Sequence, residues 1–95
     1  MQKNHFEKLL KGIWELEHGG PVIEIQGNSQ MRFLGDGRSD FYLLEEEAGT
    51  LLLTIPSLIE RSEVINISPT SLVVKERQSD ATHQLRSFKR LELDI

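Results

Sequence analysis

The sequence contains no cysteine. It therefore has no disulfide, no thiolate ligand for a metal and no thiol nucleophile, and it fits a reducing compartment. Long apolar runs are also missing, and none approaches the roughly 20 residues that a membrane-spanning helix needs. The first residues lack the apolar stretch of a secretory signal. We therefore expect no membrane span and a cytoplasmic location.

Basic residues are in the minority. The chain has 11 Lys and Arg against 15 Asp and Glu, which gives a net charge of -4. Nucleic acids and anionic membrane surfaces are bound by clustered positive charge, so this balance disfavours both partners. A length of 95 residues predicts one domain over 1–95, with a small core and marginal stability.

The start of the chain has the pattern of a helix. Phe6, Leu9, Leu10 and Ile13 follow i, i+3, i+4, i+7 spacing, which places them on one face. Gly12 ends this pattern, as glycine commonly does at helix C-termini. We therefore predict a short N-terminal helix within 1–12 and a separate architecture for 13–95.

After Gly12 the apolar period changes to two, the period of β-strands. Short runs of this kind are separated by turn residues, of which Gly27-Asn28 and Asp36-Gly37 are the clearest hairpin signals. The predicted strands cover roughly 13–18, 22–26, 31–33, 41–45, 51–55, 63–67, 72–75 and 84–93. About eight short strands without a second helix predict an all-β, up-and-down antiparallel meander closed into a small barrel.

Two segments resemble a known family. Leu9–Leu16, with Gly12 two residues before Trp14, resembles the opening motif of lipocalins and of small bacterial lipocalin-like domains. The segments Ser71–Lys75 and Arg86–Leu91 resemble the last hairpin of those domains, which often ends in an aromatic, a basic residue and a leucine. The resemblance implies a calycin-type β-barrel. The strands are shorter than in ordinary lipocalins, which have a deep ligand cup.

The resemblance also implies roles for particular residues. Lipocalins close one barrel end with an arginine of the last strand lying over the motif tryptophan. Arg90 is the first candidate for this role over Trp14, and Arg86 is the second; Gly12 belongs to the same closure. The alternative is that Trp14 is an ordinary core aromatic and both arginines face solvent.

Alternation along the strands divides the apolar residues into two sets. The set predicted to face inward consists of Trp14, Leu16, Ile23, Ile25, Met31, Phe33, Phe41, Leu43, Leu51, Leu53, Ile55, Ile65, Ile67, Leu72, Val74 and Phe88. The opposite set is Val22, Leu34, Leu44, Leu52, Val64 and Val73, and it predicts a self-association surface unless a β-bulge moves some of its members inside. The inward residues are bulky, which favours a filled interior over a ligand cup.

A ligand cup would open at the barrel end opposite Trp14. The residues expected to line it lie near the Asp36 hairpin: Phe33, Phe41, Tyr42 and Leu43. The expected ligand is a small apolar molecule. The alternative function is that of a structural module that has a filled core, binds no ligand and forms a homodimer.

Motifs for catalysis or metal binding are missing from the sequence. His5, His18 and His83 are far apart, and no His-x-His or His-x3-His spacing occurs, so we expect no metal. The segment Asp36–Asp40 lacks the spacing of a calcium loop, and a hairpin explains it better. No serine lies in a nucleophile-elbow context, and no phosphate-binding glycine loop is present. We therefore predict a non-enzymatic protein without a cofactor.

Overall fold

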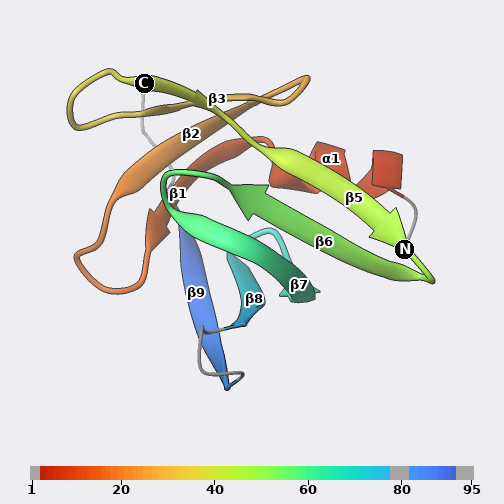
Figure 1. Cartoon of the computed structure of the whole chain (residues 1–95). Coiled ribbons are helices and arrows are strands. Elements are labelled where there is room, and N and C mark those ends of the chain that lie inside the picture. Colours follow the sequence, from red (N-terminus) through yellow and green to blue (C-terminus); the bar gives the residue numbers. More distant parts are fainter. Residues whose placement is uncertain (1–2, 78–81, 92–95) are drawn as a thin grey trace.

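The computed structural model describes residues 3–77 and 82–91, which form one helix and nine strands (Figure 1). The helix α1 spans Lys3–Leu10. The strands are β1 (Gly12–Leu16), β2 (Val22–Gly27), β3 (Gln30–Phe33), β4 (Ser39–Phe41), β5 (Leu43–Glu47), β6 (Thr50–Ile55), β7 (Ile59–Ile67), β8 (Ser71–Arg77) and β9 (His83–Leu91). The predicted turn at 78–80 and the end of the last predicted strand, 92–93, lie outside the described residues.

The nine strands form one antiparallel sheet in the order β4-β3-β2-β1-β9-β8-β7-β6-β5. Every neighbour in this order is the next strand along the chain, except that β1 pairs with the last strand, β9. The pairing of the first strand with the last curls the meander into a nearly closed barrel (Figure 1). The predicted fold class, a short helix followed by an up-and-down antiparallel barrel, is confirmed.

The count of nine strands rather than eight arises at Tyr42. This residue separates β4 from β5, which are the two ends of the sheet order. β4 pairs with β3, and β5 pairs with β6, so the predicted run 41–45 changes its partner strand at Tyr42. The Tyr42 N–H donates to the Ser29 carbonyl at 3.1 Å. One bent segment therefore joins the two edges of the sheet.

Other contacts span the opening between these edges. Beside β4, the Ser57 hydroxyl in the turn after β6 donates to the Asp40 carboxylate. The helix α1 contacts β2, β5 and β7 (Figure 1). It therefore lies across the barrel at the end where β1 begins. Phe6 and Leu10 on one face of α1 are buried in the core.

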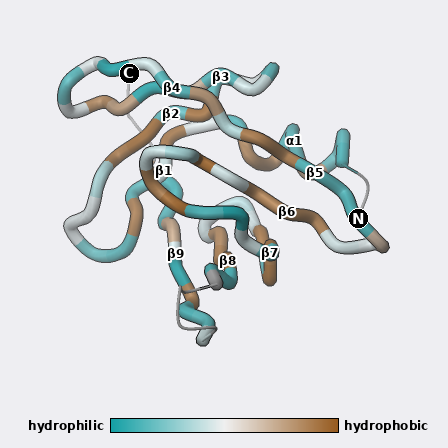
Figure 2. The backbone as a smooth tube through the Cα atoms, viewed as in Figure 1, coloured by the Kyte–Doolittle hydropathy of each residue, from teal (hydrophilic) through white to brown (hydrophobic). Residues whose placement is uncertain are grey.

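The interior is a continuous cluster of apolar side chains from α1 and from eight of the strands. Most of the predicted inward residues belong to it, including Trp14, Leu53 and Phe88. Figure 2 shows how hydropathy changes along β5, which begins hydrophobic and becomes hydrophilic towards its glutamates. The strand alternation deduced from sequence therefore identifies most of the core.

The predicted orientation of the segment around Tyr42 is wrong. Phe41 and Leu43 were predicted to face inward, but they are 48% and 44% exposed, whereas Tyr42 and Leu44 are buried. Both alternating sets of this run are apolar, so hydrophobicity does not choose between them. The choice follows from the register of β4 on β3 and of β5 on β6.

Strand β7 also departs from simple alternation. Ile65 was predicted to face inward but is 49% exposed. A register shift lies between Val64 and Asn66, where Val64 faces Val74 and Asn66 faces Val73. This β-bulge adds one residue to β7, so that Val64 as well as Ile67 packs against the core. Val64 belongs to the apolar set that was predicted to face outward unless a β-bulge moved some of its members inside.

Candidate functional site

The barrel end at α1 is held closed by Trp14 and Arg90. These residues are cross-strand neighbours on β1 and β9, and the Arg90 guanidinium carbon lies 4.3 Å from the centroid of the Trp14 ring. The Trp14 indole N–H donates to the Leu10 carbonyl at 2.8 Å. Arg90 donates to the Lys11 carbonyl at 2.7 Å and also to the Leu9 carbonyl. Both side chains therefore satisfy carbonyls that the end of a helix leaves without partners.

Gly12 leaves the space that Arg90 occupies. A Cβ atom on Gly12 would lie 2.2 Å from Arg90 Nη1, and the φ angle of Gly12 is +138°. Both the close approach and the backbone conformation therefore require glycine. Gly12, Trp14 and Arg90 thus form a structural closure in which Arg90, rather than Arg86, lies over the tryptophan.

The four residues predicted to line a ligand cup do not share one surface. Phe33 and Tyr42 are buried in the core, whereas Phe41 and Leu43 face outward. The Arg38 guanidinium carbon lies 4.4 Å from the centroid of the Phe33 ring and covers it. These positions do not bring the four side chains together as ligand contacts.

Tyr42 fills the interior where the two sheet edges meet. Its hydroxyl is buried and has no hydrogen bond of normal geometry among the described residues. Burial raises the pKa of Tyr42 above its usual 10.0, the Ser29 backbone acts in the opposite direction, and the charge of Glu7 on α1 raises it further. The phenol is therefore held in its neutral form.

The end of the barrel opposite Trp14 carries a cluster of charged side chains. Glu76 is only 7% exposed. Its carboxylate accepts hydrogen bonds from Arg86 Nη1 at 3.0 Å and from the Glu60 N–H at 2.8 Å. Arg86 also pairs with Glu17, and these carboxylates raise the pKa of Arg86 above its usual range, with Glu17 contributing most. The cluster ties the end of β1 to β7, β8 and β9.

One serine–carboxylate contact was not foreseen from the sequence. The Ser57 hydroxyl donates to Asp40, and this hydrogen bond is the main reason that the pKa of Asp40 lies below its usual 3.8. A carboxylate with a lowered pKa is a poor general base, so this pair does not activate the hydroxyl. Among residues 3–77 and 82–91, no three His, Asp or Glu side chains come together in a way that could hold a metal ion.

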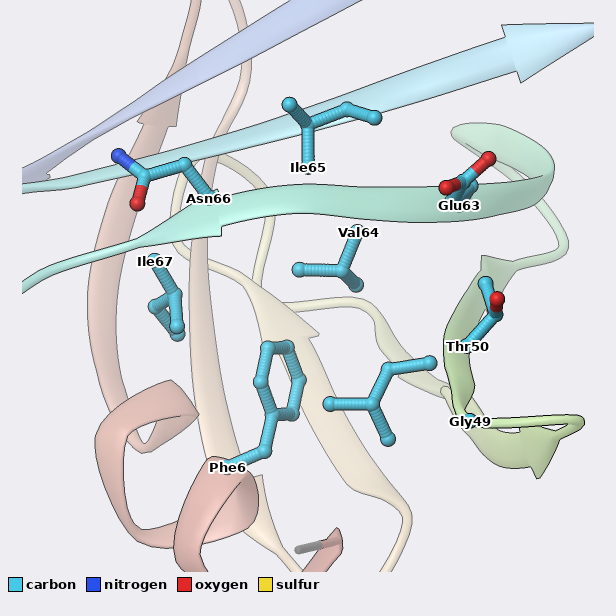
Figure 3. Close-up of a pocket in the computed structure, with 9 residues that line it drawn as sticks. Phe6, Gly49, Thr50, Glu63, Val64, Ile65, Asn66 and Ile67 are labelled. Carbon is cyan, nitrogen blue, oxygen red and sulfur yellow. The ribbon is translucent and has the colours of Figure 1, made fainter. Parts of the chain in front are cut away.

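A groove of about 270 Å³ lies between α1, the start of β6 and the second half of β7 (Figure 3). We call it the β6–β7 groove. Its lining consists of Phe6, Gly49, Thr50, Leu51, Glu63, Val64, Ile65, Asn66 and Ile67. Two further hollows, of about 290 and 240 Å³, share Glu17 and His18 near the β1–β2 turn.

The β-bulge in β7 builds the apolar floor of the groove. Val64 and Ile67 are three residues apart and would face opposite sides of a regular strand. With the bulge between them, both point towards Phe6, whereas Ile65 and Asn66 point away from it (Figure 3). Val64 and Ile67 are partly buried against the core. The sequence carries no clear signal for this arrangement, because Ile65 and Ile67 alternate as they would in a regular strand.

Comparisons of the chain with protein-family models, with curated proteins and with solved structures find no match. In the part of the chain that the structure describes, no helix has the length and apolar character required to cross a membrane. The β6–β7 groove is therefore identified as the candidate site from its own geometry.

Proposed function

We propose that this protein is a non-enzymatic, lipocalin-like binding barrel that holds an apolar group of its partner in the β6–β7 groove. The observation that carries this proposal is the floor of the groove, where the partly exposed Val64 and Ile67 of β7 pack over the fully buried Phe6 of α1. The lining also presents the polar residues Thr50, Glu63 and Asn66, and binding sites usually combine apolar side chains with polar groups that fix the orientation of the ligand.

The packing of the barrel interior favours this location over an internal cup. The bulky inward residues are buried against one another in a single cluster. Phe33 and Tyr42, the two predicted cup residues that face inward, are part of that cluster. An apolar ligand in the interior would have to displace them, whereas the groove is already open.

The size of the groove limits what it can hold. Its volume of about 270 Å³ lies just below the range of roughly 300–1,000 Å³ for sites of drug-sized ligands. The groove therefore suits a compact group, such as one aromatic ring with a short chain. This group can belong to a small apolar molecule or to a side chain of a protein partner.

A compact neutral probe tests the proposal. We expect 2-phenylethanol to bind with a millimolar Kd and to shift the amide signals of Thr50, Val64 and Ile67 in NMR correlation spectra. The variant Thr50→Phe fills the groove and should weaken binding at least about tenfold.

Thr54→Phe is the matched control, because Thr54 is also half-buried on β6 but lies outside the groove lining. It should bind the probe as the unaltered protein does. NMR shifts that cluster around Phe33 instead, or equally weakened probe binding in both variants, would show that the site does not lie in the β6–β7 groove.

Exposed apolar residues favour self-association as the second candidate function. Phe41 and Leu43 face outward on either side of Tyr42. Of the predicted outer set, Val22, Leu34, Leu52 and Val73 are half-buried, Leu44 is buried and Val64 lines the groove. A homodimer through Phe41 and Leu43 predicts a dimer mass in light scattering that Phe41→Ser with Leu43→Ser converts to a monomer. A monomer mass of the unaltered chain at high concentration would remove this candidate.

A further inference from the structure

We propose that the occupant of the β6–β7 groove is an extended, basic peptide segment of a partner protein, which adds as a strand to the free edge of β7 at residues 64–67. This inference rests on the proposed function and names the partner of that site. It follows from three features: an unpaired strand edge, an apolar floor beneath it and a local excess of negative charge.

The unpaired edge arises because β6 and β7 diverge. Their pairing runs from Ile55 opposite Ile59 to Leu52 opposite Glu63. Continuing this register would place Leu51 opposite Val64, but within the described residues the pairing ends at Glu63. Beyond that point, β7 pairs only with β8. Among the described strands, the backbone groups of residues 64–67 on the β6 side therefore have no strand partner.

Such an edge can accept another strand. A row of free N–H and C=O groups is a template for an added extended segment, and pockets beneath it select the side chains. Four residues of extended chain span about 13 Å. An edge of this length pairs with a short peptide segment rather than with a long strand of a second barrel.

The two ends of the sheet order are β4 and β5. Beside β4, the contact between Ser57 and Asp40 reaches across the opening. The helix α1 contacts both β5 and β7, so it does not distinguish these two edges. The edge at residues 64–67 instead borders the β6–β7 groove, so a segment that pairs there also gains an apolar contact.

The floor of the groove selects one apolar side chain of the segment. Successive side chains of an extended peptide point to opposite sides. A side chain that points towards the barrel would contact Val64 and Ile67, which point towards the fully buried Phe6 in Figure 3. The volume of about 270 Å³ has room for one large side chain and excludes a second.

The charges around the groove select a basic segment. Of the described residues that line the groove, Glu63 is the only ionisable one. Lys75 lies opposite Glu63 on β8 but forms no ion pair with it within the described residues. Glu46 is exposed on β5 and faces Leu51 at the start of the groove. Lysine or arginine flanking the apolar side chain would therefore complement this surface.

Titration with a blocked pentapeptide, Lys-Val-Phe-Val-Lys, tests the inference. We expect it to bind more tightly than 2-phenylethanol and to slow hydrogen exchange of amides within residues 64–67. The same peptide methylated on its internal amide nitrogens keeps its side chains but cannot donate to a strand edge, and it should bind about tenfold more weakly. Glu63→Gln should weaken binding of the unmethylated peptide about two- to fivefold.

Glu60→Gln is the control for charge, because Glu60 is exposed on the same strand and lies outside the groove lining. It should leave the affinity unchanged. Equal binding of the two peptides, or binding of 2-phenylethanol without binding of the peptide, would overturn strand addition while leaving the apolar-group proposal intact. Failure of both the peptide and 2-phenylethanol to bind would overturn the proposed function itself.

Discussion

Arg90→Ala is the most informative single substitution, because Arg90 joins the last strand to the helix and to Trp14. It removes a guanidinium carbon that lies 4.3 Å from the Trp14 ring centroid. It also removes hydrogen bonds to the carbonyls of Leu9 and Lys11. We expect the end of α1 to lose its attachment to β9 and the barrel to lose stability.

The size of the effect can be worked from these contacts. A cation–π contact contributes roughly 0.5–1 kcal/mol when exposed and about 2 kcal/mol when desolvated, and the half-buried Arg90 lies between these limits. A hydrogen bond from a charged donor contributes about 1.5–3 kcal/mol, but the exposed Lys11 carbonyl can bond to water in the variant, so its loss is partly offset. The expected decrease in the free energy of unfolding is about 2–4 kcal/mol. This is a large part of the total of about 5–14 kcal/mol typical of a chain of this length.

Thermal and urea unfolding followed by circular dichroism would measure this change. A loss of this size corresponds to a fall in Tm of roughly 10–25 °C. Lys89→Ala is the matched control, because Lys89 is the exposed neighbour on β9 and should change stability by less than about 0.5 kcal/mol. Arg90→Lys should lie between them, since an ammonium keeps the charge but not the planar fork. An Arg90→Ala variant that melts like Lys89→Ala would refute the structural role of the stack.

Two further predictions concern Gly12 and Tyr42. Gly12→Ala places a Cβ atom 2.2 Å from Arg90 Nη1 at a φ of +138°, so it should lower the free energy of unfolding by about 1–3 kcal/mol. Gly35→Ala is the control, because no atom lies within 4 Å of its Cβ, and it should change the free energy of unfolding little. Equal losses of stability in the two variants would contradict this prediction. Tyr42 is the only tyrosine, and its pKa is raised, so its phenolate absorbance should develop above pH 10. Its contribution to stability is complete below pH 10 and is lost as the pH rises through the raised value; Tyr42→Phe should be less sensitive to alkali, and identical alkaline profiles would contradict this.

The architecture was predictable because its signals are local. The period of α1, the change at Gly12 and the turn residues between the strands each act within a few positions of the chain. The family resemblance added the contact between Arg90 and Trp14, which are 76 residues apart and which no local pattern connects. The structure places them as cross-strand neighbours because β1 pairs with β9.

The orientation of side chains was predictable only where one strand face is apolar. Ile23 and Ile25 alternate with polar residues, and both are buried as expected. Around Tyr42 both faces are apolar, so the side that enters the core depends on the two pairings that meet there. A one-residue difference in register exchanges the two faces, and hydrophobicity alone does not detect it.

The candidate site depends on features that a sequence does not display. The β6–β7 groove exists because two strands that are paired at Leu52 and Glu63 separate beyond that point. The bulge between Val64 and Asn66 then turns two side chains towards Phe6. Strand divergence and bulges result from the curvature of a closed sheet, so they require the three-dimensional arrangement.

The helix α1 links the stability of the barrel to the candidate site. The carbonyls of Leu10 and Leu9 in its last turn accept hydrogen bonds from Trp14 and Arg90, and the same helix places Phe6 beneath the groove. A substitution that loosens α1 therefore changes both unfolding and binding, so it cannot separate the two roles. Thr50 and Glu63 lie on the strands that border the groove. Among the described residues, the side-chain hydrogen bonds of Trp14 and Arg90 go to Leu9, Leu10 and Lys11 and involve neither of them. Substitutions at these two positions can therefore test binding while the barrel stays closed.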